Sequence, residues 1–157
     1  MGKYDLVEQV LSDLQAEFFF IGAQIQPGRP VVFGRCSWSR TGISSPHYFF
    51  GLPGNPVSTM VTFELFARPV VRALAGAKPE PLIFLKARLK SEVRTKTGLK
   101  RFLPAVLSGE FENAEVDLAR WQGSGDIAAL AGANCYLVIP PDRELIGAAE
   151  WVSVMMR

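Results

Sequence analysis

The sequence predicts a mixed α/β unit followed by a small all-β unit of the barrel or sandwich type. Two observations lead to this prediction. The first half alternates helical and strand-like apolar patterns, whereas the second half consists of short β-type segments separated by turn residues. Between the halves lies a stretch rich in proline and glycine, GAKPEP at 76–81. We therefore expect two units, residues 1–78 and residues 79–157.

The first half predicts a helix followed by three strands. Apolar residues at helical spacing between Leu6 and Leu14 indicate the helix. Asp5 stands at its start with Glu8 three residues on, which resembles a capping box. Apolar runs bounded by glycine, proline or polar residues then predict the strands. These runs are residues 18–26, 31–36 and 47–52.

A second helix follows the third strand. Asn55 is placed to act as its N-cap, and Pro56 occupies the first helical position, where no intrahelical hydrogen bond needs its N–H. Pro69 should kink or divide this helix near Arg68. The second half then predicts five β-type segments and one short helix. The segments are residues 83–93, 100–107, 114–121, 135–140 and 150–156, and the helix is residues 126–132.

Composition and charge exclude several classes of protein. With a net charge of +2, the chain lacks the positive excess expected of a protein that binds nucleic acid or a membrane surface. Its most apolar long window, residues 57–75, is interrupted by charged residues and proline, which argues against a membrane span. The two cysteines, Cys36 and Cys135, favour buried free thiols over a metal cluster or a disulfide framework. No signal-peptide pattern is visible, so we expect a cytoplasmic protein.

The segment GLPGNPVS at 51–58, between the third strand and the second helix, is the first candidate ligand-binding loop. The start of a helix leaves unpaired backbone N–H groups at the positive end of the helix dipole, which suits an anion. Asn55 would satisfy one of these donors, and we expect the N–H groups of Val57 and Ser58 to point into a crevice. The alternative is a stiff turn with a capped helix and no ligand.

The residue types of this segment predict a rigid loop. We expect Gly51 or Gly54 to adopt a backbone conformation that a Cβ would oppose. Pro53 and Pro56 would stiffen the two flanks.

A second candidate loop, QPGRP at 26–30, also follows a strand and also contains Pro-Gly. Its Arg29 carries a permanent charge and donors that suit oxyanions, although a lone arginine is often only a solvated surface charge. If both loops lie at the same edge of one sheet, they face a common crevice of the kind in which α/β proteins bind ligands.

These loops resemble those of the molybdopterin molybdenumtransferase (MoeA) family, which acts in molybdenum cofactor synthesis and includes the E domain of gephyrin. The resemblance covers nearly the whole chain, and GLPGNPVS is its most specific piece. The matching segments are GKYD at 2–5, QPGRP at 26–30, GLPGNPVSTMVTFELFARP at 51–69 and QGSGDIAALAGANCYLVIP at 122–140. The resemblance implies a partial three-layer α/β sandwich of the molybdopterin-binding type, followed by a small C-terminal β-barrel-like domain.

The resemblance also implies a reaction, the insertion of molybdate into adenylylated molybdopterin, with release of AMP and dependence on Mg²⁺. It further implies a homo-oligomer and a partnership with molybdopterin adenylyltransferase. One alternative is a non-enzymatic, gephyrin-like oligomerisation or interaction module with the same fold. Another is a pterin-binding relative that adenylylates, but the C-terminal β unit argues against it.

Roles for individual residues follow from the same resemblance. Asp5 matches an acidic residue with a catalytic or metal-linked role, although it could equally be only a helix cap. Ser124 matches a serine that the second unit contributes, although it could belong to a turn before a helix. The expected substrate- and oxyanion-binding residues are Arg29, Pro30, Gly51, Pro53, Gly54, Asn55, Pro56, Ser58 and Ser124.

The sequence departs from the family pattern in two places and in its extent. Gln26 stands where the family usually has a lysine, and Leu99 stands near the position of an arginine, for which Lys100 or Arg101 could compensate. The family's chains also carry a longer region before the GKYD-like motif. We therefore expect a C-terminal portion that is inactive alone and whose open strand edges associate with another chain.

Overall fold

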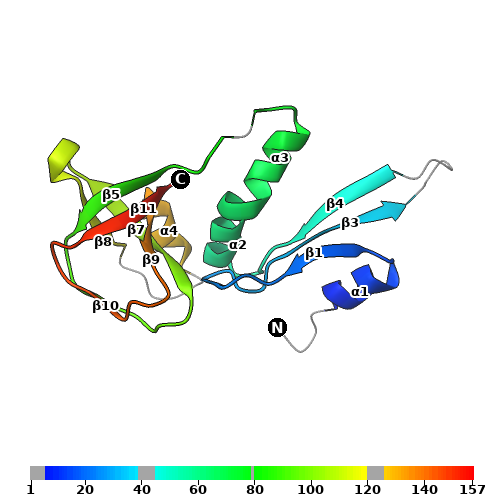
Figure 1. Ribbon diagram of the computed structural model, residues 1–157, viewed down its shortest axis with the longest axis horizontal. Helices are drawn as coiled ribbons and strands as arrows, with labels where there is room; N and C mark the ends of the chain where they lie inside the picture. Colours follow the sequence, from blue (N-terminus) through cyan, green and yellow to red (C-terminus); the bar gives the residue numbers. More distant parts are fainter. Residues whose placement is uncertain (1–5, 39–44, 79, 120–125) are drawn as a thin grey trace.

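The computed structural model describes residues 6–38, 45–78, 80–119 and 126–157. These residues form an α/β unit that leads into a small closed β-barrel, so the predicted fold class is confirmed (Figure 1).

The α/β unit begins with α1 (Val7–Asp13), followed by β1 (Glu17–Ile21), β2 (Ile25–Gln26), β3 (Val32–Trp38) and β4 (Ser45–Gly51). Strands β1, β3 and β4 form an antiparallel sheet in which β3 is central, so β1 and β4 have free edges among the described residues. The strand expected over residues 18–26 is divided, because the chain turns at Gly22 with a φ of +85°. Strands β3 and β4 extend beyond the apolar runs at 31–36 and 47–52, and Trp38 pairs with Ser45.

Helix α1 differs from the sequence-based expectation at its start. It begins at Val7 with Leu6 in the N-cap position, and no side chain of the described residues caps it. The proposed capping residue, Asp5, lies outside the described residues. No residue of α1 is buried, which leaves its apolar side chains largely exposed.

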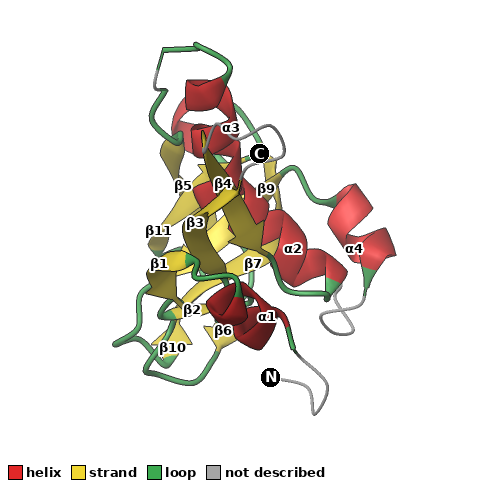
Figure 2. Cartoon of the chain, turned by 90° about the vertical axis from the view of Figure 1, so that its right-hand side faces the viewer, coloured by secondary structure: helices red, strands yellow, loops and turns green. Residues whose placement is uncertain are grey.

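The second helix is a rod of three parts that runs beside the sheet (Figures 1 and 2). These parts are α2 (Pro56–Thr62), the π-helix η1 (Phe63–Ala67) and α3 (Arg68–Leu74). The predicted division near Arg68 is confirmed, since α3 starts there. Pro69 has no N–H for an α-helical bond and its ring needs room in the preceding turn, which a wider π-turn provides.

The second half forms the barrel. Its elements are β5 (Phe84–Leu89), β6 (Val93–Arg94), β7 (Lys100–Ser108), the 3₁₀-helix η2 (Phe111–Asn113), β8 (Glu115–Leu118), α4 (Ile127–Gly132), β9 (Cys135–Ile139), β10 (Leu145–Ile146) and β11 (Trp151–Met156). The order β7-β8-β5-β11-β9 closes because β9 also pairs with β7. The predicted short helix is confirmed as α4, which lies beside α2 and is capped by Asp126 through a 2.9 Å bond from the Ala129 N–H (Figure 2).

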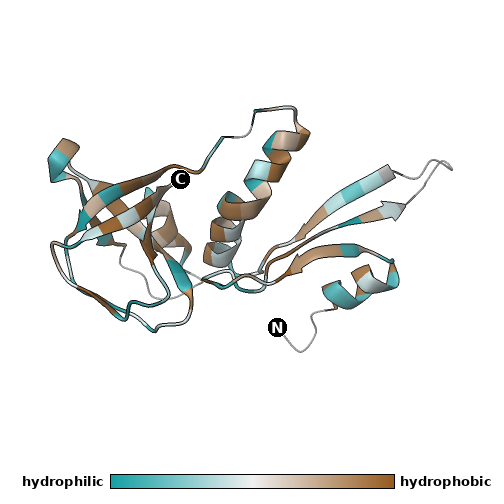
Figure 3. Cartoon of the chain, viewed as in Figure 1, coloured by the Kyte–Doolittle hydropathy of each residue, from teal (hydrophilic) through white to brown (hydrophobic). Residues whose placement is uncertain are grey.

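Two apolar cores hold this architecture together. One fills the barrel, whose strands carry much of the apolar sequence (Figure 3). The other joins the two halves of the chain, because Val57 and Val61 of α2 pack with Phe102 and Tyr136 of the barrel. Strand β2 adds to this junction by pairing in parallel with β7.

Both cysteines are free thiols, as predicted, but only Cys135 is buried, whereas Cys36 is half-buried on β3. Within the described residues, no helix is long and apolar enough to cross a membrane.

Candidate functional site

The two loops singled out in the sequence meet at the start of α2. Gly28 of the first loop is buried, and a Cβ built on it would lie 2.5 Å from Cγ2 of Thr62 and 3.7 Å from the carbonyl oxygen of Ser58. The backbone of this loop therefore packs directly on the first turns of α2. Its φ of +110° at Gly28 is one that only glycine adopts without strain.

A cavity of about 330 Å³ lies where the loops meet. One wall comes from α1 and β3, and the other from the β4–α2 junction. The lining residues are Val7, Glu8, Pro30, Val32, Gly51, Leu52, Pro53, Gly54, Asn55 and Ser58. The structure therefore brings six of the predicted site residues to one cavity. Of the other two described ones, Pro56 forms the first turn of α2, and Arg29 is exposed beside Pro30 without lining the cavity.

The start of α2 is capped as the sequence predicts. Asn55 has an extended backbone conformation, and its Oδ1 accepts a 3.5 Å hydrogen bond from the Ser58 N–H. Thr59 strengthens the turn, because its hydroxyl donates to the carbonyl oxygens of Asn55 and Pro53. The expectation of a free Ser58 N–H is therefore wrong, since the cap occupies this donor. The same expectation for the Val57 N–H stays a prediction.

The rigidity of this junction does not come from its glycines. Neither Gly51 nor Gly54 has a positive φ, and a Cβ on Gly54 would meet no atom within 4 Å. A Cβ on Gly51 would lie 3.3 Å from Cβ of Val32, a tight contact but no conformational barrier. The expected backbone conformation is therefore wrong for both. Where the two loops meet, the residue that needs to be glycine is Gly28, which the Pro-Gly pair of the first loop could have indicated.

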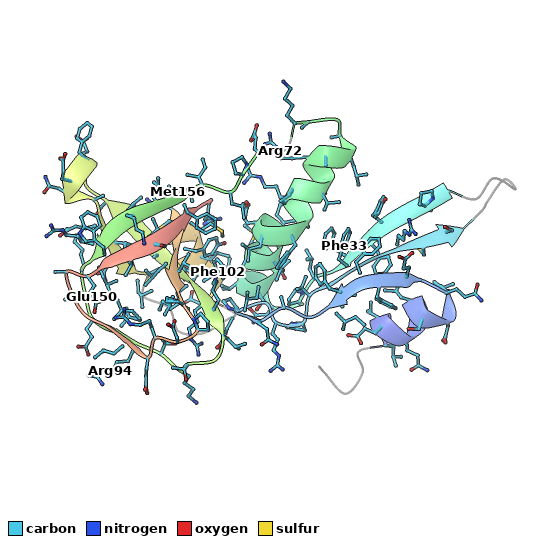
Figure 4. All side chains as sticks on the ribbon, viewed as in Figure 1. Phe33, Arg72, Arg94, Phe102, Glu150 and Met156 are labelled. Carbon is cyan, nitrogen blue, oxygen red and sulfur yellow. The ribbon has the colours of Figure 1, made fainter. Side chains whose placement is uncertain are left out.

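A second cavity, of about 460 Å³, lies on the barrel side of the first loop and is basic. Its lining residues are Gln26, Arg94, Thr95, Lys96 and Arg101. Arg94 marks this region at the edge of the barrel in Figure 4. Arg94 and Lys96 carry no local signal in the sequence, because their proximity to Gln26 depends on the pairing of β2 with β7.

Arg101 organises this second cavity. It is only 8% exposed, and its Nε and Nη2 donate to the carbonyl oxygen of Lys96 at 3.2 and 2.7 Å. Its Nη1 donates to Oε1 of Gln26. Of the basic residues near Leu99, Arg101 is therefore bonded to Gln26 through its side chain, whereas Lys100 meets this segment through its backbone. The charge of its guanidinium lies next to the loop in which the family usually carries a lysine.

The other two predicted site residues, Asp5 and Ser124, lie outside the described residues. In the described part of the chain, no group of three or more His, Cys, Asp or Glu side chains could hold a metal ion. Glu8 is the one carboxylate among the described residues that line the two-loop cavity. Mg²⁺ is usually held by one or two carboxylates together with waters and phosphate oxygens, and the described residues offer it the Glu8 carboxylate at this cavity.

Comparisons with known proteins agree with this geometry. Residues 1–73 match a family described as a probable molybdopterin binding domain, and residues 86–156 match the MoeA C-terminal region (domain IV). A molybdopterin molybdenumtransferase of Nostoc sp. is 29% identical over 159 residues, which cover 99% of this chain and 35% of that protein. The molybdenum cofactor synthesis protein cinnamon of Drosophila melanogaster is 49% identical over 76 residues, 48% of this chain and 11% of that protein.

Solved structures agree as well. The crystal structure of a molybdopterin biosynthesis MoeA protein from Pyrococcus horikoshii superposes with a TM-score of 0.73 at 30% identity, over 97% of this chain and 34% of that one. A molybdenum cofactor biosynthesis protein from Pyrococcus furiosus gives a TM-score of 0.68 at 26% identity, over 99% of this chain and 55% of that one. The chain spans about a third of the length of the curated relatives that match all of it. With both domain types present in one chain and in this order, the chain belongs to the molybdopterin molybdenumtransferase (MoeA) family.

Proposed function

We propose that this chain provides an oxyanion-binding part of an enzyme that inserts molybdate into adenylylated molybdopterin. The observation that carries the proposal is the cavity at the start of α2, to which GLPGNPVS and Pro30 both contribute. Molybdate is a tetrahedral dianion, and the start of a helix next to a positively charged side chain suits such a group. Membership of the MoeA family supports the same substrate class.

In this proposal the chain's own residues bind and orient the anion. The rigid turn around Asn55 fixes the first turn of α2, and Ser58 places a hydroxyl at the cavity. Arg29 is exposed and precedes Pro30, which lines the cavity, and in this proposal its side chain extends to the bound anion. A guanidinium there would give the anion charge-assisted hydrogen bonds.

The remaining roles are also proposals. Asp5 would be catalytic or linked to Mg²⁺, and Ser124 would contribute from the second unit. Since the chain spans about a third of its curated relatives, AMP release belongs to the longer protein, and the 157 residues alone are proposed to be inactive. A cytoplasmic homo-oligomer that receives its substrate from molybdopterin adenylyltransferase completes the proposal.

The direct test is a calorimetric titration of molybdate and of tungstate into the wild type and into the Arg29→Ala variant. We expect binding to weaken by about tenfold or more, because one charge-assisted contact is lost. Arg35→Ala on β3 is the matched control, since Arg35 is an exposed arginine outside the cavity, and it should bind normally. Equal affinities for both variants and the wild type would remove Arg29 from the site. Molybdate-dependent AMP release by the 157 residues alone would contradict their proposed inactivity.

A second candidate function, an oligomerisation module, is favoured by one observation. Helix α1 buries none of its residues, and Leu6, Val7, Val10 and Leu14 are each more than half exposed. Light scattering would measure the mass in solution, and Val10→Lys should reduce any association through this face. A monomeric wild-type chain would argue against the module.

A further inference from the structure

We propose a second ligand site, remote from the two-loop cavity, that binds a compact carboxylate or phosphate carrying a small apolar group. The site is a cavity of about 140 Å³ between α3, the connection after it and the end of β11. Its polar lining residues are Arg68, Arg72, Glu80 and Arg157. None of them lines the two-loop cavity, so the two sites can be tested separately. Figure 4 shows Arg72 and Met156 on the two sides of this junction.

Three arginines are among the lining residues, and each is held by other contacts. Arg68 donates from Nη1 to Glu64 at 2.6 Å. Arg157 donates from Nη1 to the carbonyl oxygens of Leu130 and Ala133 at 2.8 and 2.9 Å. These contacts use one nitrogen of each guanidinium and leave the others to donate elsewhere. The guanidinium groups are therefore held in place before any ligand arrives, with the charge of Arg68 partly offset by Glu64.

Arg72 identifies the kind of group that the cavity takes. Its Nη2 pairs with Oε1 of Glu80 at 2.6 Å, whereas its Nε is buried and has no hydrogen-bond partner among the described residues. A guanidinium binds a carboxylate best through two parallel N–H groups, and a buried donor without an acceptor is destabilising. A carboxylate or phosphate with two suitably placed oxygens would satisfy both donors, which Glu80 does not do.

The Glu80 carboxylate occupies the place beside Arg72 that the ligand would take, and a ligand can displace it. Its side chain is 64% exposed, compared with 38% for Arg72, and exposed ion pairs contribute little to stability. A ligand carboxylate can therefore take its place at small cost. Glu80 also shows that the position accepts a carboxylate.

The rest of the cavity is apolar and small. Leu82, Ile83 and Met156 line it together with Pro69 and Pro81. A cavity of about 150 Å³ is large enough to hold a benzene ring, so a single ring or a short branched chain fits beside the charged group. A bare inorganic anion would make no apolar contact with these side chains. We therefore expect an aromatic or branched carboxylate to bind more tightly than phosphate alone.

The test is a titration of the full chain with benzoate, inorganic phosphate and benzyl alcohol. Binding is monitored through the methyl NMR signals of Leu82, Ile83 and Met156. Benzoate should shift these signals at lower concentration than the other two probes do. Arg72→Gln should weaken benzoate binding by about tenfold or more. Glu80→Gln should strengthen it by about two- to fivefold, because the competing carboxylate is removed.

The matched controls are Arg35→Gln and Glu17→Gln, which alter an exposed ion pair of 2.7 Å outside the cavity and should leave benzoate binding unchanged. If Arg72→Gln unfolds the chain, the affinity of Glu80→Gln for benzoate still tests the proposal. Only competition between Glu80 and the ligand predicts that this variant binds benzoate more tightly. The proposal is overturned if benzoate does not shift these methyl signals or if Glu80→Gln does not tighten binding. It is also overturned if phosphate binds as tightly as benzoate. Molybdate binding at the two-loop cavity should be the same in Arg72→Gln, so failure of one site does not imply failure of the other.

Discussion

Gly28 and Thr62 are in such close contact that a Cβ on Gly28 would lie 2.5 Å from Cγ2 of Thr62. This contact joins the loop that carries Arg29 to the second turn of α2. It also fixes the distance between the two loops that form the cavity. The glycine is therefore needed both for its positive φ and for the lack of a side chain.

Gly28→Ala should destabilise the protein by about 2 to 4 kcal/mol, because backbone strain and overpacking add. Urea unfolding followed by circular dichroism measures this change. Gly54→Ala is the control, since Gly54 has no positive φ and no atom within 4 Å of an added Cβ. That variant should stay within about 0.5 kcal/mol of the wild type. Equal stability of the two variants would show that the loop can move away from α2.

Asn55→Ala should cost about 0.5 to 2 kcal/mol of stability, because the Ser58 N–H loses its acceptor. Asn55→Asp should retain most of the stability, since aspartate is an equally good N-cap. Thermal unfolding of the three proteins gives the comparison. If alanine and aspartate behave alike, the side chain at this position does not cap α2.

Arg101→Met should destabilise the protein by about 2 to 3 kcal/mol, because it removes charge-assisted hydrogen bonds to Gln26 and Lys96 at a site that is 8% exposed. Arg94→Met is the control from the same cavity. Its side chain is 74% exposed and pairs with Glu92, so its loss should cost less than about 1 kcal/mol. Denaturant unfolding at one pH separates the two cases, and equal costs would contradict a structural role for Arg101.

Cys135 should make the protein less stable in alkali. Burial raises the pKa of its thiol from 9.0 to about 11, so the folded chain holds this proton more tightly than the unfolded chain. The resulting stabilisation is complete below about pH 9 and is lost as the pH rises through about 11. Burial also raises the pKa of Tyr136, which acts in the same direction.

The measurement is the free energy of unfolding between pH 8 and pH 10.5 for the wild type and Cys135→Ala. The variant should lose less stability over this range, whatever its absolute stability. An identical pH dependence would show that Cys135 ionises as easily in the folded chain as in the unfolded one. Iodoacetamide should meanwhile label the half-buried Cys36 before Cys135 in the native protein.

Local signals in the sequence predicted local features well. The cap at Asn55, the first helical position of Pro56 and the division of the helix near Arg68 depend on residues within one or two turns of each other. The fold class also followed from patterns of this range, and the family resemblance added the order of the domains. Short-range chemistry is enough to fix such features because each depends on a few neighbouring dihedral angles.

Contacts between distant residues could not be predicted in this way. The pairing of β2 with β7, the burial of Gly28 against Thr62 and the bond from Arg101 to Gln26 all join segments far apart in the chain. For the same reason, the glycine with a conformation that a Cβ would oppose was expected at Gly51 or Gly54 and not at Gly28. Only the packed structure shows which glycine another element approaches.

The core that joins the two halves has a consequence for the covalent connection between them. Val57 and Val61 are fully buried in a cluster with Phe102 and Tyr136, and β2 is a strand of the barrel's sheet although it precedes α2 in the chain. A single proteolytic cut between Gly76 and Pro81 would therefore break the backbone without exposing either partner of these contacts. The two pieces should migrate together in native electrophoresis and separate only in denaturant. After the cut, the chain would therefore behave as a non-covalent complex of two fragments.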